Sequence, residues 1–121
     1  MAKFRQIELN GTCTAGGALT LTSENLVGYL EKIQMDYADG ATGADFVITA
    51  ISPVVEPVLT VTNAGVADVT WYPRVLANKV ADASAFTDVA QRIYMNGQLK
   101  IVVAQGGASK DFKFLVVIND D

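Results

Sequence analysis

The chain has 121 residues, half of them apolar and only 18% charged, with a net charge of −4. This length fits one domain, which buries enough surface for a core without disulfides or metals. Its nine Lys and Arg residues are spread singly, so a nucleic-acid backbone or an anionic membrane surface finds no basic run to bind.

The low charge content points to a partner. Typical soluble domains are about 25% charged, and a small domain has a large surface to cover with polar groups. We therefore expect part of the surface to be covered, by further copies of the chain or by a larger lattice. A monomer with a Thr-, Ser- and Asn-rich surface is the alternative.

The N-terminal residues 1–5 carry early positive charge but no apolar run behind it, and the longest aliphatic run covers only residues 115–118. We therefore expect neither a signal peptide nor a membrane span, and synthesis in the cytoplasm. Cys13 is the only cysteine, with no basic neighbour to lower its pKa. It is expected to be a small half-buried side chain rather than a reactive thiol.

The dominant hydrophobic period is two, as in half-buried strands. In chain order, the segments that read as strands are residues 2–9, 18–22, 26–37, 44–51, 58–63, 68–72, 92–95, 98–103 and 111–118. Residues 26–37 also fit a helix face in part, but Gly28 disfavours a helix and the alternation continues beyond it. We predict a strand that is bent or bulged near Gly28.

Two later segments have distinct expectations. Residues 75–90 are rich in Ala and Asp and are predicted to form a long irregular loop or arm. Asn96-Gly97 lies between two alternating runs and predicts a type I′ hairpin, which would begin a C-terminal meander. About eight strands without a long helix predict an all-β fold. We expect one antiparallel β-sandwich domain, jelly-roll-like, over residues 1–121, with an up-and-down barrel as the alternative.

Catalytic residues are scarce. The sequence contains no histidine, the commonest general base and metal ligand, and no Walker A loop. We therefore expect no enzymatic activity, no cofactor and no metal. Asp36, Asp39 and Asp45 surround a glycine-containing loop, which indicates turn chemistry and leaves a cation site as the alternative.

The most distinctive cluster is Trp71-Tyr72-Pro73-Arg74, since Trp, Tyr and Arg are enriched at interface hot spots. Neighbouring strand residues point to opposite faces, so we expect Trp71 inside and Tyr72 at the rim. A sugar-stacking platform is the alternative. The residues expected to contact a partner or a second copy are Trp71, Tyr72, Arg74, Phe86 and Tyr94.

Several segments carry a resemblance when taken together. They are Met-Asp-Tyr at 35–37, Thr-Gly-Ala-Asp at 42–45, Leu-Thr-Val-Thr-Asn at 59–63, Trp-Tyr-Pro-Arg at 71–74 and the run 97–104. Over most of residues 26–118 the chain resembles the small head-decoration, or cement, proteins of tailed bacteriophages. Residues 75–90 depart from this pattern.

The resemblance implies a virion structural protein on the outer capsid surface. Such a module would form a dimer or trimer, bind the major capsid protein and stabilise the expanded lattice by mass action. An acidic net charge suits an outward position, away from packaged DNA. Another virion component, such as a head fibre base or a tail protein, and a carbohydrate-binding module using Trp71 and Tyr72 are the alternatives.

Overall fold

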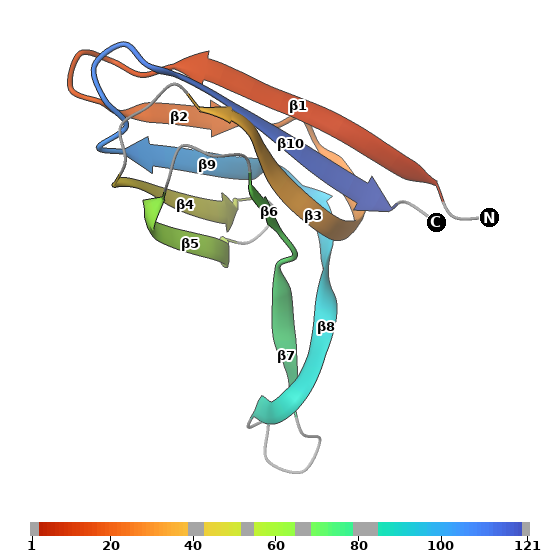
Figure 1. Ribbon diagram of the computed structural model, residues 1–121. Coiled ribbons are helices and arrows are strands. Elements are labelled where there is room, and N and C mark those ends of the chain that lie inside the picture. The colour runs from red at the N-terminus through yellow and green to blue at the C-terminus, as the bar shows by residue number, and fades with distance from the viewer. Residues whose placement is uncertain (1–2, 39–42, 52–54, 65–68, 79–84, 120–121) are drawn as a thin grey trace.

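The computed structural model describes residues 3–38, 43–51, 55–64, 69–78 and 85–119 (Figure 1). These residues form strands and no helix. The strands are β1 (Phe4–Thr12), β2 (Leu19–Thr22), β3 (Leu26–Ala38), β4 (Ala44–Ala50), β5 (Glu56–Ala64), β6 (Val69–Trp71), β7 (Arg74–Asn78), β8 (Ala85–Gly97), β9 (Leu99–Ala104) and β10 (Asp111–Asn119).

The strands pair in two antiparallel sheets. One sheet has the order β1-β10-β3-β8-β7, with β6 also paired to β3, and the other has the order β2-β9-β4-β5. Without β6 and β7, the remaining eight strands have the jelly-roll order, in which the chain passes back and forth between two packed sheets. The prediction of an antiparallel, jelly-roll-like sandwich is confirmed.

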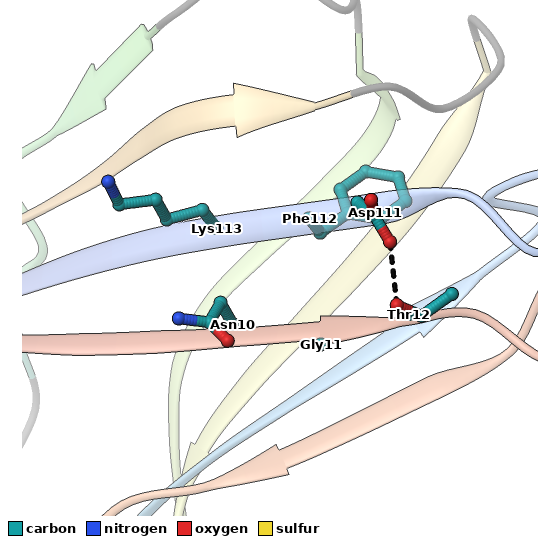
Figure 2. Close-up of a pocket in the computed structure, with 6 residues that line it drawn as sticks. All are labelled: Asn10, Gly11, Thr12, Asp111, Phe112 and Lys113. Carbon is teal, nitrogen blue, oxygen red and sulfur yellow. Dashed lines mark hydrogen bonds between the residues drawn. The ribbon is translucent and has the colours of Figure 1, made fainter.

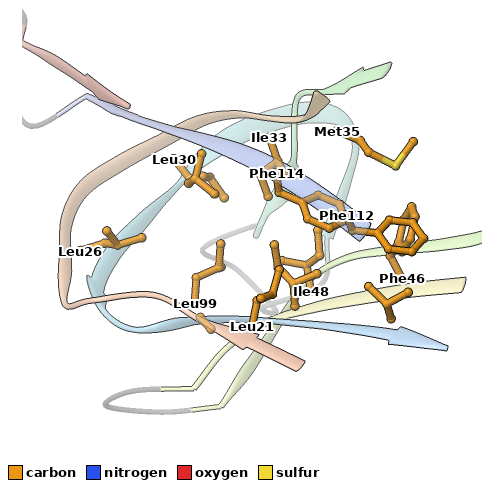
Figure 3. Close-up of a cluster of buried hydrophobic side chains, with 14 of the residues drawn as sticks. Leu21, Leu26, Leu30, Ile33, Met35, Phe46, Ile48, Leu99, Phe112 and Phe114 are labelled. Atoms are coloured by element: carbon orange, nitrogen blue, oxygen red, sulfur yellow. The ribbon is translucent and has the colours of Figure 1, made fainter. Parts of the chain in front are cut away.

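The core lies between the two sheets, and the period of two decides which side chains enter it. On β10, Phe112, Phe114, Val116 and Ile118 are buried while the residues between them are partly exposed. Leu99, Ile101 and Val103 of β9 are likewise fully buried. Figure 3 shows these layers facing each other, with Leu26 and Leu30 at one end and the phenylalanines at the other.

Phe46 of β4 joins the two sheets. Its ring meets those of Phe112 and Phe114 edge to face, with centroids 5.8 and 5.3 Å apart, and that of Trp71 at 6.1 Å. Edge-to-face pairs add to the free energy of area burial. The opposite side of β4 is open, since Val47 is 45% exposed.

A bulge interrupts the long strand β3. On β10, Val117 pairs with Lys32 and Ile118 with Leu30, so Glu31 is the extra residue of β3. The bulge lies three residues beyond Gly28, where the sequence predicted a bend. Gly28 itself has a φ of 134°, a conformation that residues with a Cβ rarely adopt.

The predicted hairpin at Asn96-Gly97 is wrong. Both residues belong to β8, where they pair with Val27 and Leu26, and neither has a positive φ. The chain instead crosses from one sheet to the other after Gly97, because β8 pairs with β3 whereas β9 pairs with β2 and β4. The crossing lets the apolar residues of both strands enter the same core. A hairpin within one sheet would also bury them, so the alternating pattern alone does not distinguish the two arrangements.

Ser23 fixes this crossing. Its backbone N–H donates to the Leu99 carbonyl, and its hydroxyl oxygen accepts from the Leu99 N–H, both at 2.8 Å. The side chain of Gln98 donates to the Ser23 carbonyl at 3.2 Å. A buried serine, 3% exposed, thus supplies the hydrogen bonds that a tight turn would otherwise have made.

Residues 75–90 were predicted to form a long irregular loop or arm, and their described part is an arm, but a regular one built from two paired strands. Arg74 pairs with Arg92, Leu76 with Ala90 and Asn78 with Ala85. Figure 1 shows β7 and β8 projecting away from the sandwich. The Ala and Asp residues of this stretch have low β propensity, so local composition hid a strand pair that long-range register creates.

Candidate functional site

The base of the hairpin arm is held by one carboxylate. Arg92 Nη1 donates to Glu31 Oε1 at 2.5 Å, and Arg74 Nη2 lies 3.9 Å from Glu31 Oε2. Arg74 Nη1 also donates to the backbone oxygens of Glu31, at 3.1 Å, and Pro73, at 2.7 Å. The bulge in β3 therefore aims Glu31 at two cations that face each other across the arm.

Arg92 also connects this arm base to two tyrosines. Its guanidinium carbon lies 4.3 Å from the centroid of the Tyr29 ring, a cation–π geometry. Tyr29 in turn meets Tyr94 edge to face, with centroids 5.2 Å apart. Glu31, Arg92 and the two rings thus form one continuous polar and aromatic surface.

An aromatic row crosses the outer face of the larger sheet. Phe4 pairs with Asn119, Asn119 with Tyr29, and Tyr29 with Tyr94, so these residues stand side by side on four strands. Phe4 is 66% exposed and Tyr94 57%. Large aromatic side chains in the open are typical of surfaces that contact a partner.

The five residues predicted from the sequence fall in different surroundings. Trp71 is half-buried against Phe46, while Tyr72 is 63% exposed, as expected for one inner and one outer position. Arg74 and Tyr94 both belong to the surface around the arm base. Phe86 lies in β8, but its side chain is outside the described residues.

Sequence reasoning missed Phe4, Tyr29, Glu31 and Arg92. They come from three strands that are far apart in the chain, and each taken singly reads as an ordinary strand residue. The one available signal was Tyr29, next to the bulge-prone Gly28. Trp71 is half-buried against Phe46 whereas Tyr72 is exposed, so the two rings lie in different environments.

A surface cavity of about 320 Å³ lies where β1 meets β10 (Figure 2). Thr12 Oγ1 donates to Asp111 Oδ1 at 2.6 Å, and the two residues are paired in register. Lys113 Nζ lies 3.0 Å from Glu8 Oε1. These contacts are cross-strand pairs that hold the two strands together, and the cavity residues offer Thr12 no base other than Asp111.

Cys13 is buried, with only 3% of its surface exposed. Burial, and secondarily the negative charge of Asp111, raises the pKa of its thiol. A raised pKa keeps the sulfur protonated at neutral pH and lowers its nucleophilicity. The side chain packs against the core near Gly106, where a Cβ would lie 2.9 Å from the sulfur.

Over the described ranges, no group of three or more Cys, Asp or Glu side chains is placed to hold a metal ion. The candidate cation loop falls largely outside them, since Asp39 is not described and neither is the side chain of Asp36. In the same part of the chain, no helix is long and apolar enough to cross a membrane.

Comparisons with known proteins give no family. No family model matches the chain, and no curated protein does. Among solved structures, it is similar to chains from the Gt and Gx strains of infectious bursal disease virus, with a TM-score of 0.37 and 14% and 15% identity. The match covers 98% of this chain and 32% of those chains, and at these values it carries no conclusion about function.

Proposed function

We propose that this protein is a structural component of a tailed-phage virion, which binds the outer capsid surface and stabilises the lattice of the major capsid protein. The observation that carries the proposal is the aromatic row beside the arm base, in which Phe4 and Tyr94 are exposed and Tyr29 between them is partly buried. The sequence resemblance to head-decoration proteins suggests that the partner is a phage capsid.

The aromatic row suits a protein partner. Tyr and Phe supply large contact areas at low cost in side-chain entropy, and Tyr and Arg are the types that recur in interface hot spots. The row lies on a sheet face, whose backbone is fixed by hydrogen bonds on both sides of β10 and β3. A preorganised face loses little entropy on binding.

The arm supports the same reading. A two-stranded hairpin on its own is marginally stable in water. Here β7 pairs only with β8 among the described strands, and the base is tied down by Glu31. An arm held at one end and projecting from the sandwich gains most when its length lies on a neighbouring subunit.

The fold is compatible with this role but does not select it, because jelly rolls occur in viral capsids and in lectins alike. In our proposal the protein acts by contact and not by catalysis. It associates with itself as a dimer or trimer and with the major capsid protein, but not with nucleic acid or membrane. Covered faces would account for its low charge content.

Sedimentation with capsids tests the proposal. Purified protein is mixed with expanded capsids of the phage that encodes it, and the pelleted fraction and the capsid melting temperature are measured. We expect saturable binding and a higher melting temperature, since a ligand at about 100 times its Kd stabilises by about 2.7 kcal/mol.

A matched pair of variants locates the surface. Tyr94→Ala should weaken capsid binding at least tenfold, since a hot-spot residue contributes about 2 kcal/mol or more. Val47→Ala removes an exposed apolar side chain from the other sheet and should leave binding unchanged. Protein that stays in the supernatant at all concentrations would exclude the proposed function.

A further inference from the structure

One edge of the larger sheet is straight and open. Among the described strands, β1 is the last of that sheet, and it pairs with β10 over nine residues without a register shift. In the other sheet, the edge strand β5 carries Pro57 and two register shifts, which discourage further pairing, and the edge strand β2 has only four residues. Of these three edges, β1 is the best suited to accept an added strand.

The register of β1 shows which of its backbone groups face the open edge. The Cys13 N–H donates to the Lys110 carbonyl at 2.8 Å, one residue beyond the pair of Thr12 with Asp111. Hydrogen-bonded and non-hydrogen-bonded pairs alternate along an antiparallel ladder, so the odd-numbered residues of β1 are the ones that bond to β10. The residues whose N–H and C=O groups point toward the open edge are Gln6, Glu8, Asn10 and Thr12.

The core side of β1 is incompletely covered. Ile7 and Leu9 pair with buried residues of β10 and so face the core, yet both are only partly buried at the sheet edge. On the same side, a Cβ added to Gly11 would lie 2.9 Å from the side chain of Leu19, so β2 already fills that place. A strand added to β1 would cover the two apolar side chains.

We propose that β1 pairs with β1 of a second copy of this chain, antiparallel about a two-fold axis at Leu9. Residues 6–12 of the two copies then overlap, and their backbones form about eight hydrogen bonds in four pairs. On the core side, Leu9 meets Leu9, and Ile7 lies opposite Gly11. The outer side chains, Glu8 opposite Asn10 and Gln6 opposite Thr12, pair amide donors with oxygen acceptors.

The charges of β1 select this register. An axis at Glu8 would oppose the two Glu8 carboxylates, and opposed like charges destabilise a strand pair. An axis nearer the N-terminal end would set Arg5, which pairs with the buried Ile118 and faces inward, against an apolar side chain. An axis nearer the C-terminal end would shorten the overlap. With the axis at Leu9, Arg5 lies beyond the overlap and Glu8 meets the neutral Asn10, so β1 is complementary to itself.

The pairing names the surface for the self-association in the proposed function, on which its biological role rests. Opposed residues of paired strands lie on the same side of a sheet, so the outer faces of both copies point in one direction. The dimer therefore presents two aromatic rows to one capsid surface. Two linked contacts bind more tightly than either contact alone.

Disulfide formation locates the two-fold axis. Opposed residues of a non-hydrogen-bonded pair have Cα atoms about 4.5 Å apart, within the range that a disulfide spans. In a Cys13→Ala background, Leu9→Cys should therefore form a covalent dimer on mild oxidation, seen on a non-reducing gel. Ile7→Cys is the matched control on the same side of β1. In this register the two Ile7 positions are about 14 Å apart along the strands, so this variant should stay uncrosslinked.

Sedimentation velocity of the purified protein measures the association itself. Asn10→Pro removes an N–H that faces the open edge and spares the hydrogen bonds to β10, so the fold is kept while the Kd of the dimer should rise at least tenfold. Asn10→Thr keeps that N–H and should weaken the dimer less. Circular dichroism checks that every variant is folded.

Four results would overturn the assignment. They are a wild-type protein that stays monomeric, equal losses in the two Asn10 variants, a folded Leu9→Cys that does not crosslink, and crosslinking of Ile7→Cys in its place. Capsid sedimentation is scored separately on the same samples. A monomer that binds capsids would contradict this inference alone, and a dimer that ignores capsids would contradict the proposed function alone.

Discussion

Replacing Glu31 with glutamine should loosen the hairpin arm while the sandwich stays folded. The substitution removes the charge that Arg74 and Arg92 share, and these two cations are directly opposed across β7 and β8. Like charges in opposed positions destabilise a strand pair. The two hydrogen bonds from Arg74 to backbone oxygens remain, so the arm is weakened and not released.

The size of the effect follows from exposure. The Glu31 side chain is 22% exposed and those of Arg74 and Arg92 are 29% and 41% exposed, which places the cluster between surface and buried ion pairs. Exposed pairs contribute about 0.2–1 kcal/mol, and hydrogen bonds to charged groups about 1.5–3. We expect a loss of about 1 kcal/mol in the free energy of arm opening, or about fivefold in its equilibrium constant.

Native-state hydrogen exchange measures this opening directly. In Glu31→Gln, amides of β7 and of the paired part of β8 should exchange about fivefold faster, while those of β10 should keep their rates. Glu8→Gln is the control, because it breaks a comparable pair with Lys113 on the same sheet, away from the arm. Unchanged arm exchange in Glu31→Gln, or equal acceleration in Glu8→Gln, would refute the reasoning.

Further predictions concern the core and the buried thiol. Phe46→Ala should lower the free energy of urea unfolding by about 3–5 kcal/mol, and Val47→Ala by less than about 1; equal losses would contradict the burial pattern. Gly106→Ala should cost about 1–3 kcal/mol by overpacking, because its Cβ would lie 2.9 Å from Cys13 Sγ; an unchanged melting temperature would disprove it. Cys13 should react with a thiol reagent only as the chain unfolds. Since burial raises its pKa, the unfolded chain loses the thiol proton first, so stability should fall above about pH 8.5. Cys13→Ala should remove that part of the fall in a pH series of unfolding curves.

Much of the fold follows from local pattern. Alternating Phe112, Phe114, Val116 and Ile118 predict a strand with one buried face, and the same rule places the buried side of β9. Such patterns are set by neighbouring residues and by the need to bury one face. The count of strands and the absence of long amphipathic helices then limit the fold to a sandwich or barrel.

The sheet partners do not follow from local pattern. Asn96-Gly97 favours a hairpin by turn chemistry, yet the chain crosses between sheets there, held by hydrogen bonds to Ser23, more than 70 residues earlier. The alternation of β8 and β9 is the same in either case. Only the pairing partners, β3 for β8 but β2 and β4 for β9, distinguish the crossing from a hairpin.

The candidate surface was predictable in part. Tyr72, Arg74 and Tyr94 were identified by residue type. Arg74 and Tyr94 lie at the arm base, and Tyr72 is exposed. The residue that links them, Glu31, is one acid among thirteen in the sequence. Its role arises from a bulge and from the departure of β8 toward β7, both of which are long-range features.

Electron microscopy of capsids incubated with the protein tests the central claim most directly. Expanded capsids of the tailed phage that we propose to encode this chain are imaged with and without saturating protein, and the two reconstructions are subtracted. We predict additional density of the sandwich and its arm on the outer surface, repeated at symmetry-related positions and in contact with the major capsid protein. Capsids that show no added outer density at saturating protein would contradict the account.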